Sequence, residues 1–308
     1  MRKSELVKKE EKSNDISGWI CLDKPSGMSS NRAMMKVRKM FGCKAGYVGT
    51  LDPFATGVLP IALGETRKFI PYVSETQKNY IFTMEFGSTT DTLDKDGEIT
   101  ETSTKIPNES EIAEILSSFL GDQDQMPPIF SAIKIMGKRA CDRVRSGEVV
   151  MLSSRKVHIF SISLIAIRNN EADLQVTCSK GTYVRSLARD IAEKLGTVAY
   201  VKSLRRIKSG FFSINNAITL EKLLQIKDTS VSLCCLLSHE SPLDDIPALR
   251  VSKNDVVKLQ NGLHVSCANE RLGSTNVLIF EDHGGSFAGI GFFSDDGTVK
   301  PVRMCVFN

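Results

Sequence analysis

The 308-residue sequence lacks several features that define large classes of protein. No apolar run approaches the roughly 18 residues that a membrane-spanning helix needs. None of the eight cysteines belongs to a Cys-x-x-Cys pair, and residues 1–12 are highly charged without the apolar core of a secretory signal. Neither an internal repeat nor a low-complexity tract is present. These absences predict a cytoplasmic protein with reduced thiols, and they argue against a membrane span, a disulfide framework and a zinc site.

The composition is that of a soluble globular protein, with 41% hydrophobic and 25% charged residues. The net charge of +4 says little about partners, but its distribution is uneven. Basic side chains gather in two clusters: Lys134, Lys138, Arg139, Arg143, Arg145, Arg155 and Lys156, opposed only by Asp142 and Glu148, and then Lys202, Arg205, Arg206 and Lys208. Either cluster alone could be a solvated surface. The two together favour a polyanionic partner such as RNA.

One loop, from Gly46 to Pro60, carries a single carboxylate, Asp52, among glycines and prolines. Pro53 disfavours the helical region for Asp52, so the loop should present this acid from an extended, stiff backbone. Such a group suits a nucleophile or a general base. An ordinary Asp-Pro surface turn is the alternative. The many apolar residues that flank Asp52 favour instead a loop that lies against a core or lines a cleft.

The hydrophobic patterns predict an α+β fold with a mixed, largely antiparallel central sheet and flanking helices. The expected strands are 19–22, 80–86, 157–167 and 174–178, the last two turning near Asn169-Asn170. The expected helices run from Ser29 or Ser30 to Phe41, from a capping box of Asn108 and Glu111 towards Gly121, and from about Val184 to Gly196. Residues 89–97 are predicted to be a loop.

The chain is expected to divide into three parts. Residues 1–16 form a disordered charged tail, and residues 17–245 form a catalytic domain with a basic insert at about 127–155. Residues 246–308 form a small β-rich module, with turns at Asn261-Gly262, Gly284-Gly285 and Asp296-Gly297.

Two further polar residues occupy unusual positions. Tyr80 begins a strand whose neighbours on the same face are apolar, and Arg185 opens a helix. Tyr80 could be a core aromatic and Arg185 a surface residue. However, a cation at the start of a helix faces the positive end of the helix dipole. A compensating anion would explain Arg185, and Asp52 is one candidate.

The segment Gly49–Pro60 resembles the catalytic motif of the bacterial tRNA pseudouridine-55 synthases, the TruB family. Six further matches occur in the expected order: Leu22–Ser30, Gly64–Lys68, Lys78–Tyr80, Ser131–Lys134 with Gly137-Lys138, Ser179–Arg185 and Leu204–Arg206. The resemblance is strong from Gly18 to Phe211. It is weaker over the last 60 or so residues, where Phe287–Gly291 and Val299–Arg303 resemble the C-terminal RNA-binding module of the family.

This resemblance implies an isomerase that detaches a tRNA uridine from its ribose, turns the base over and rejoins it through carbon, with no cofactor or metal. Asp52, Tyr80 and Arg185 match the catalytic aspartate, the tyrosine that stacks on the base and the arginine that keeps the aspartate ionised. Tyr183 and Leu204 match positions that line the uridine pocket. The RNA-binding residues implied in the insert and beyond it are Lys134, Lys138, Arg139, Arg143 and Arg205.

The same resemblance implies a pseudouridine-synthase-like fold with a PUA-like module at residues 246–308. The expected partner is the T-arm of tRNA, bound by a monomer that needs no obligate protein partner and no membrane. A pure RNA-binding or tRNA-folding protein and a synthase for ribosomal or guided RNA are the alternatives.

Two positions depart from the family pattern. Tyr47 replaces a histidine that helps to fill the place of the flipped base, and Cys141 replaces a tyrosine of the insert. Tyr47 can still stack on a base, so we expect it to bind the substrate. Lys24 and Lys68 could be structural supports or RNA contacts, and for Lys24 we expect a brace under the Asp52 loop.

Overall fold

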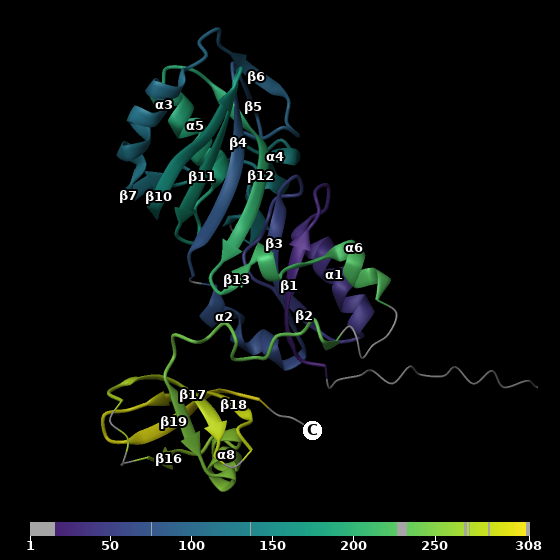
Figure 1. The fold of residues 1–308 in the computed structure, drawn as a ribbon, viewed down its shortest axis with the longest axis vertical. Coiled ribbons are helices and arrows are strands. Elements are labelled where there is room, and N and C mark those ends of the chain that lie inside the picture. The colour runs from purple at the N-terminus through teal and green to yellow at the C-terminus, as the bar shows by residue number, and fades with distance from the viewer. Residues whose placement is uncertain are drawn as a thin grey trace, which may run out of the picture.

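The computed structural model describes residues 16–74, 76–135, 137–226, 233–267, 270, 272–282 and 284–305. Most of the expected tail, residues 1–15, lies outside these ranges. The molecule is elongated, with a large sheet in its upper part and a smaller sheet at its lower end (Figure 1). Among the described residues, no helix has the length and apolar character needed to cross a bilayer.

The large sheet has ten strands, eight of which follow the order β14-β1-β3-β12-β4-β11-β10-β7. Its strands are β1 (Gly18–Lys24), β2 (Ala45–Tyr47), β3 (Thr56–Leu63), β4 (Lys78–Phe86), β7 (Gly121–Gln125), β10 (Arg155–Arg168), β11 (Glu171–Cys178), β12 (Ala199–Ser209), β13 (Phe212–Ser213) and β14 (Ile218–Thr219). Among the described strand pairs of this sheet, only β1–β14 and β3–β12 are parallel. The predicted α+β class with a mixed, largely antiparallel sheet is therefore confirmed.

The period-two patterns behave as predicted. Along β4, Tyr80, Phe82, Met84 and Phe86 are buried, while the residues between them are half-buried. Strands β10 and β11 pair as an antiparallel hairpin, and Asn169 takes a φ of 51° in the turn between them. Asparagine tolerates this left-handed conformation better than most residues do, which is why the turn forms there.

Three helices, α1 (Ser30–Phe41), α3 (Glu109–Leu116) and α5 (Val184–Lys194), pack their apolar sides into one common core with the sheet. Ser29 caps α1, and the capping box of Asn108 and Glu111 begins α3 as predicted. The shorter helical segments are η1 (Gly64–Phe69), α2 (Ile70–Val73), η2 (Ser117–Phe119), α4 (Ala140–Arg145), η3 (Ile214–Asn216) and α6 (Leu220–Gln225).

Two small ribbons extend from this body. Strands β5 (Ser88–Thr90) and β6 (Ile99–Thr102) pair with each other, so the predicted loop at residues 89–97 is wrong at Thr89 and Thr90, which have extended backbone. Strands β8 (Lys134–Ile135) and β9 (Lys138–Arg139) pair within the basic insert, directly before α4.

The C-terminal sheet has the order β15-β17-β18-β19-β16. Its strands are β15 (Ala248–Val251), β16 (Val265–Ser266), β17 (Thr275–Glu281), β18 (Phe287–Phe293) and β19 (Thr298–Met304). The sequence interpretation missed α8 (Lys253–Gln260), which begins at the cap Ser252. Phe287 packs against Phe69 of the upper body with ring centroids 5.2 Å apart, and both belong to an apolar cluster that joins the two sheets.

Candidate active site

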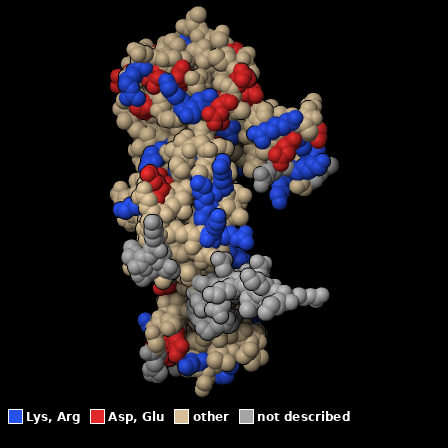
Figure 2. Space-filling model, turned by 90° about the vertical axis from the view of Figure 1, so that its right-hand side faces the viewer, with Lys and Arg blue, Asp and Glu red and all other residues tan. Residues whose placement is uncertain are grey.

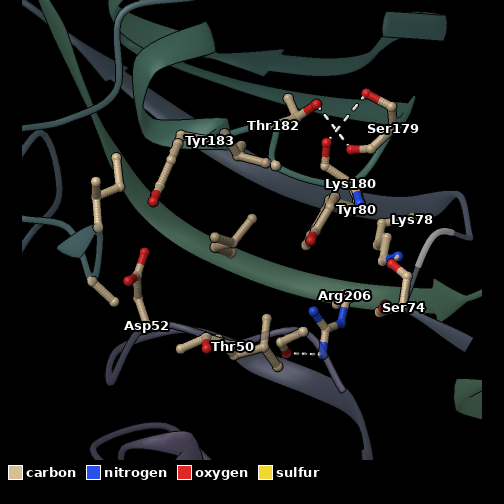
Figure 3. Close-up of a pocket in the computed structure, with 17 residues that line it drawn as sticks. Thr50, Asp52, Ser74, Lys78, Tyr80, Ser179, Lys180, Thr182, Tyr183 and Arg206 are labelled. Carbon is tan, nitrogen blue, oxygen red and sulfur yellow. Dashed lines mark hydrogen bonds between the residues drawn. The ribbon is translucent and has the colours of Figure 1, made fainter. Parts of the chain in front are cut away.

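A cavity of about 360 Å³ lies where the Asp52 loop, β4, β12 and the start of α5 meet (Figure 3). The insert also contributes to its wall. The lining residues are Gly49, Thr50, Leu51, Asp52, Ser74, Lys78, Tyr80, Ala132, Ile133, Ser179, Lys180, Gly181, Thr182, Tyr183, Val184, Leu204 and Arg206. This volume is in the range of small-ligand pockets, which combine apolar walls with a few polar groups.

The predicted ion pair between Asp52 and Arg185 is present. Nε of Arg185 donates to Oδ2 of Asp52 over 2.9 Å, although the two residues are 133 positions apart in the sequence. The Arg185 side chain is 4% exposed, whereas that of Asp52 is 31% exposed and reaches the cavity. A charge-assisted contact at a partly dry site fixes the direction of the carboxylate. The structure thus orients Asp52 from behind and leaves it accessible from the cavity.

The Arg185 guanidinium is held by three more acceptors. It donates to the carbonyl oxygens of Thr92, at 2.6 Å, and of Phe130, at 3.1 Å, and lies 3.4 Å from Oδ2 of Asp94. Asp94 is buried, and burial raises the pKa of its carboxyl against the opposing effects of a hydrogen bond from Thr92 and the charge of Arg185. Sequence reasoning missed Asp94 because its polar, acidic surroundings look like a solvated loop.

Two buried polar side chains brace the Asp52 loop from the side of β1 and α1. The hydroxyl of Ser30 bonds both the N–H and the carbonyl of Leu51, at 2.8 and 2.9 Å. Nζ of Lys24 donates to the carbonyls of Met28 and Pro53, at 2.6 and 3.3 Å. Burial lowers the pKa of Lys24 to about 8, and the charge of Asp52 opposes this shift. Lys24 is therefore the brace that the sequence predicted.

Arg206 braces the same loop from the side of β12, and sequence reasoning gave it no role of its own. Its guanidinium is buried and donates to the carbonyls of Val58, at 2.7 Å, and Gly49, at 2.9 Å. Gly49 has a φ of +68°, and a Cβ there would lie 3.1 Å from Nη1 of Arg206. A period-two reading of β12 could have found Arg206, because it shares a strand face with the buried Leu204.

Tyr80 and Arg206 are directly opposite each other on β4 and β12. Tyr80 is only 9% exposed, and burial raises the pKa of its hydroxyl. The charge of Arg206 and a hydrogen bond from it lower that pKa in part. Tyr80 is therefore a neutral phenol beside a fixed cation, which stabilises negative charge as the hydroxyl gives up its proton.

The other predicted pocket residues differ in their placement. Tyr183 and Leu204 line the cavity, and the guanidinium of Arg155 lies over the Tyr183 ring, 5.3 Å from its centroid. Tyr47, on β2, is half-buried against the core and is not among the lining residues. Its contact with substrate stays a prediction.

The predicted RNA-binding cations are not equally available. Lys134 and Lys138 are exposed. Arg143 donates to the carbonyl of Ile135 and pairs with Glu148 within the insert. Arg205 pairs with Asp23, Nη2 to Oδ2 at 2.8 Å. The side chain of Arg139 lies outside what the structure describes.

Lys78 is a further lining residue that the sequence interpretation left without a role. It is buried and donates to the carbonyls of Ser74, at 2.9 Å, and Thr76. It shares its strand face with Tyr80, so the alternation along β4 was the available signal. Lys78 and Lys180 give the wall remote from Asp52 a basic character (Figure 3). Over the residues that the structure describes, no three His, Cys, Asp or Glu side chains gather as a metal site.

Three family descriptions match consecutive parts of the chain. Residues 32–184 match the TruB family pseudouridylate synthase (N terminal domain). Residues 185–244 match the tRNA pseudouridylate synthase B C-terminal domain, and residues 247–305 match Pseudouridine synthase II TruB, C-terminal. The chain belongs to the TruB family of pseudouridylate synthases.

Two curated relatives align with this chain over most of their own length. The protein named tRNA pseudouridine synthase B of Roseobacter denitrificans is 44% identical over 302 residues, which cover 96% of this chain and 98% of the relative. The protein of the same name in Zymomonas mobilis subsp. mobilis is 45% identical over 253 residues, covering 80% and 84%.

Solved structures agree with the fold of this TruB-family chain. One titled "Structure of H/ACA RNP bound to a substrate RNA containing 2'-deoxyuridine" has a TM-score of 0.70 at 21% identity, covering 94% of this chain and 85% of that one. A Cbf5-Nop10-Gar1 complex has a TM-score of 0.68 at 23% identity, covering 94% and 84%. At such identities the likeness concerns the fold alone, and it confirms the fold class expected from the resemblance.

Proposed function

We propose that this protein is a tRNA pseudouridine synthase that isomerises uridine 55 in the T-loop. The observation that carries the proposal is the Asp52 carboxylate, which faces a nucleoside-sized cavity while Arg185 holds it at 2.9 Å. Family membership adds the reaction class, and relatives named tRNA pseudouridine synthase B add the substrate.

The reaction breaks the bond between C1′ and N1, and forms a bond between C1′ and C5. N1 finishes with a proton and C5 loses one, so no oxidant or reductant is needed. Asp52 acts first, as nucleophile or as base, and must be ionised to do so. The Arg185 guanidinium holds the carboxylate at 2.9 Å and aims it at the sugar.

Tyr80 takes the proton from C5 once the new bond has formed. Its phenol first passes its own proton to N1 of the detached base, and the adjacent Arg206 guanidinium stabilises the resulting phenolate. The uracil ring is planar and neutral, so the aromatic and aliphatic walls of Tyr80, Tyr183 and Leu204 suit it. The base must leave its stack to enter the cavity, at a cost of a few kcal/mol.

RNA binding is assigned to surfaces around the cavity. Residues 127–155 clamp the T-arm through Lys134, Lys138, Arg139 and Arg143, and Arg205 contributes once RNA competes with Asp23 for its guanidinium. Phosphate contacts of this kind position the RNA, while its shape selects it. Residues 17–245 form the catalytic domain and residues 246–308 a PUA-like module. The protein works as a cytoplasmic monomer without an obligate protein partner.

A tritium-release assay tests this proposal. The purified protein is incubated with a tRNA transcript carrying uridine tritiated at C5, and a second transcript has cytidine at position 55. We expect close to one tritium released per molecule of the first tRNA and no tritium released from the second. Normal tRNA binding without release would make the protein an RNA-binding or RNA-folding protein instead.

A further inference from the structure

Helix α1 carries a basic stripe that no function described above uses. The stripe consists of Arg32, Lys36 and Lys39, which are four and three residues apart and therefore lie on one side of the helix. All three side chains are exposed. Figure 2 shows Lys and Arg side chains gathered without intervening acids along the middle of the face that carries α1 and α6.

This arrangement is unfavourable for the helix itself. The sequence of α1 contains no acidic residue, and within the described part of the chain none of the three cations has a carboxylate within ion-pair distance. Like charges three and four residues apart destabilise an isolated helix. Arg32 also stands in the first turn, facing the positive end of the helix dipole. Only Lys39, which stands in the last turn, faces the favourable end of the dipole, so Arg32 and Lys36 do not serve the stability of α1.

The stripe is connected to the active site through the start of its helix. Ser30, the first residue of α1, bonds both backbone groups of Leu51, which precedes Asp52. Lys36 also lines a second cavity, of about 430 Å³, together with Glu221 and with Arg205, which pairs there with Asp23. The active-site cavity therefore has the basic insert on one side. On another side it has the Asp52 loop, to which Ser30 binds the start of α1.

We propose that Arg32, Lys36 and Lys39 form a binding surface for the phosphate backbone of the RNA whose uridine enters the cavity. The stripe spans about 10 Å of helix at a rise of about 1.5 Å per residue. One nucleic-acid strand carries a phosphate about every 3.4 Å along its axis, so roughly three phosphates fit. The identity of this RNA as tRNA rests on the proposed function.

The test replaces all three cations: Arg32→Gln, Lys36→Gln and Lys39→Gln in one protein. Equilibrium binding of an unmodified tRNA transcript is measured between 50 and 200 mM salt. Each lost phosphate contact lowers the slope of log affinity against log salt by about 0.7–0.9. We expect the slope to fall by about 2–3 and kcat at saturating tRNA to stay within about twofold. The melting temperature should stay close to that of the wild type, because the relieved repulsion in α1 offsets the lost dipole contact of Lys39.

A matched variant removes the same charge elsewhere: Lys105→Gln, Arg168→Gln and Lys194→Gln. Lys105 and Arg168 are already paired with carboxylates, and Lys194 donates to Ser118. Its salt slope should equal that of the wild type. A slope that is unchanged in the α1 variant, or that falls equally in both variants, overturns the proposal. So does a lower melting temperature of the α1 variant, which would make the stripe structural.

Binding and turnover separate this inference from the proposed function. A wild-type protein that binds tRNA with the expected salt dependence but releases no tritium would refute the proposed enzyme activity and leave the proposed binding surface on α1 standing. An active enzyme whose salt slope does not respond to the α1 substitutions would refute the binding surface and leave the enzyme activity standing.

Discussion

The Asp52 loop and the basic insert border the same cavity, yet they are built in opposite ways. Carbonyls on both sides of Asp52, at Gly49, Pro53 and Val58, accept hydrogen bonds from the buried cations Arg206 and Lys24. In the insert, Val149 and Met151 are 96% and 89% exposed. Arg143, an insert cation whose side chain the structure describes, makes its bonds within the insert itself.

We attribute this difference to two separate tasks: the reaction at the Asp52 loop and RNA recognition at the basic insert. Under the proposed function, the Asp52 carboxylate must be in position before substrate arrives, and buried cations that bond backbone carbonyls achieve this with little freedom left to lose. A surface that grips a large, irregular RNA gains from side chains that can still adapt. Substitutions in the Asp52 loop and its braces should therefore lower kcat, whereas substitutions in the insert should change tRNA affinity.

The largest expected effect comes from Asp52→Asn. The amide keeps the size of the side chain but cannot act as nucleophile or base, so turnover should fall by at least about 10⁴-fold. Binding of tRNA should stay within a few fold of the wild type, measured by equilibrium titration beside single-turnover tritium release. An active Asp52→Asn protein would remove the carboxylate from its role.

Arg206→Lys tests the brace rather than the reacting group. One ammonium cannot reach both Val58 and Gly49, so a buried carbonyl loses its donor, which costs about 1–3 kcal/mol of stability. A displacement of the loop by about 1 Å can lower kcat by roughly 100-fold. Urea unfolding and kcat measure the two effects. Lys208→Arg, at an exposed position of the same strand, is the control and should change neither.

The pH dependence of stability should arise from Lys24, which braces the Asp52 loop. The pKa of Lys24 is about 8 in the folded protein and about 10.4 in an unfolded chain. Below pH 8 the ammonium is charged in both states, and its burial cost is present in full. As the pH rises above 8, only the folded protein releases the proton, so stability should rise, by about 1 kcal/mol between pH 7 and 9.

Urea unfolding of the wild type, Lys24→Met and Lys138→Met at both pH values measures this effect. The rise should disappear in Lys24→Met and persist in Lys138→Met, which changes an exposed insert residue. In Asp52→Asn it should begin at lower pH, because the carboxylate no longer supports the Lys24 charge. A rise that survives in Lys24→Met would assign the titration to another group.

The smallest expected effect lies in the insert. Cys141 is partly exposed and stands where the family pattern has a tyrosine. Cys141→Tyr restores a ring that can stack on RNA, worth about 1 kcal/mol or slightly more, so tRNA should bind about fivefold tighter. The value of kcat should not change, and Cys141→Ala should leave affinity unaltered. A Cys141→Tyr protein with altered kcat and unaltered affinity would contradict the division between the two regions.

Sequence patterns predicted the parts of this fold that follow from local rules. The alternation along β4, the capping box of α3 and the turn at Asn169 were all readable, because each depends on neighbouring residues. Helix α8 was missed since it has only eight residues and two buried side chains, Val256 and Leu259. Its apolar pattern is too short to distinguish it from loop.

The candidate site was predictable where a motif or an electrostatic imbalance pointed to it. Arg185, a cation at a helix start, required an anion, and Asp52 was the available one. Asp94 and Arg206 were not assigned roles, because their burial depends on strands and turns distant in sequence. Tyr47 does not line the cavity of the free protein, so its role depends on RNA that the sequence pattern alone cannot place.

The central claim is that Asp52, aimed by Arg185, converts a single T-loop uridine. The most direct measurement maps pseudouridine, with a reagent specific for it, in tRNA from a strain that lacks this protein and from the same strain supplied with wild type or Asp52→Asn. The account predicts that the signal at position 55 disappears from many tRNAs in the deletion strain, returns with wild type and stays absent with Asp52→Asn. A signal that persists in the deletion strain, or returns with Asp52→Asn, would contradict it.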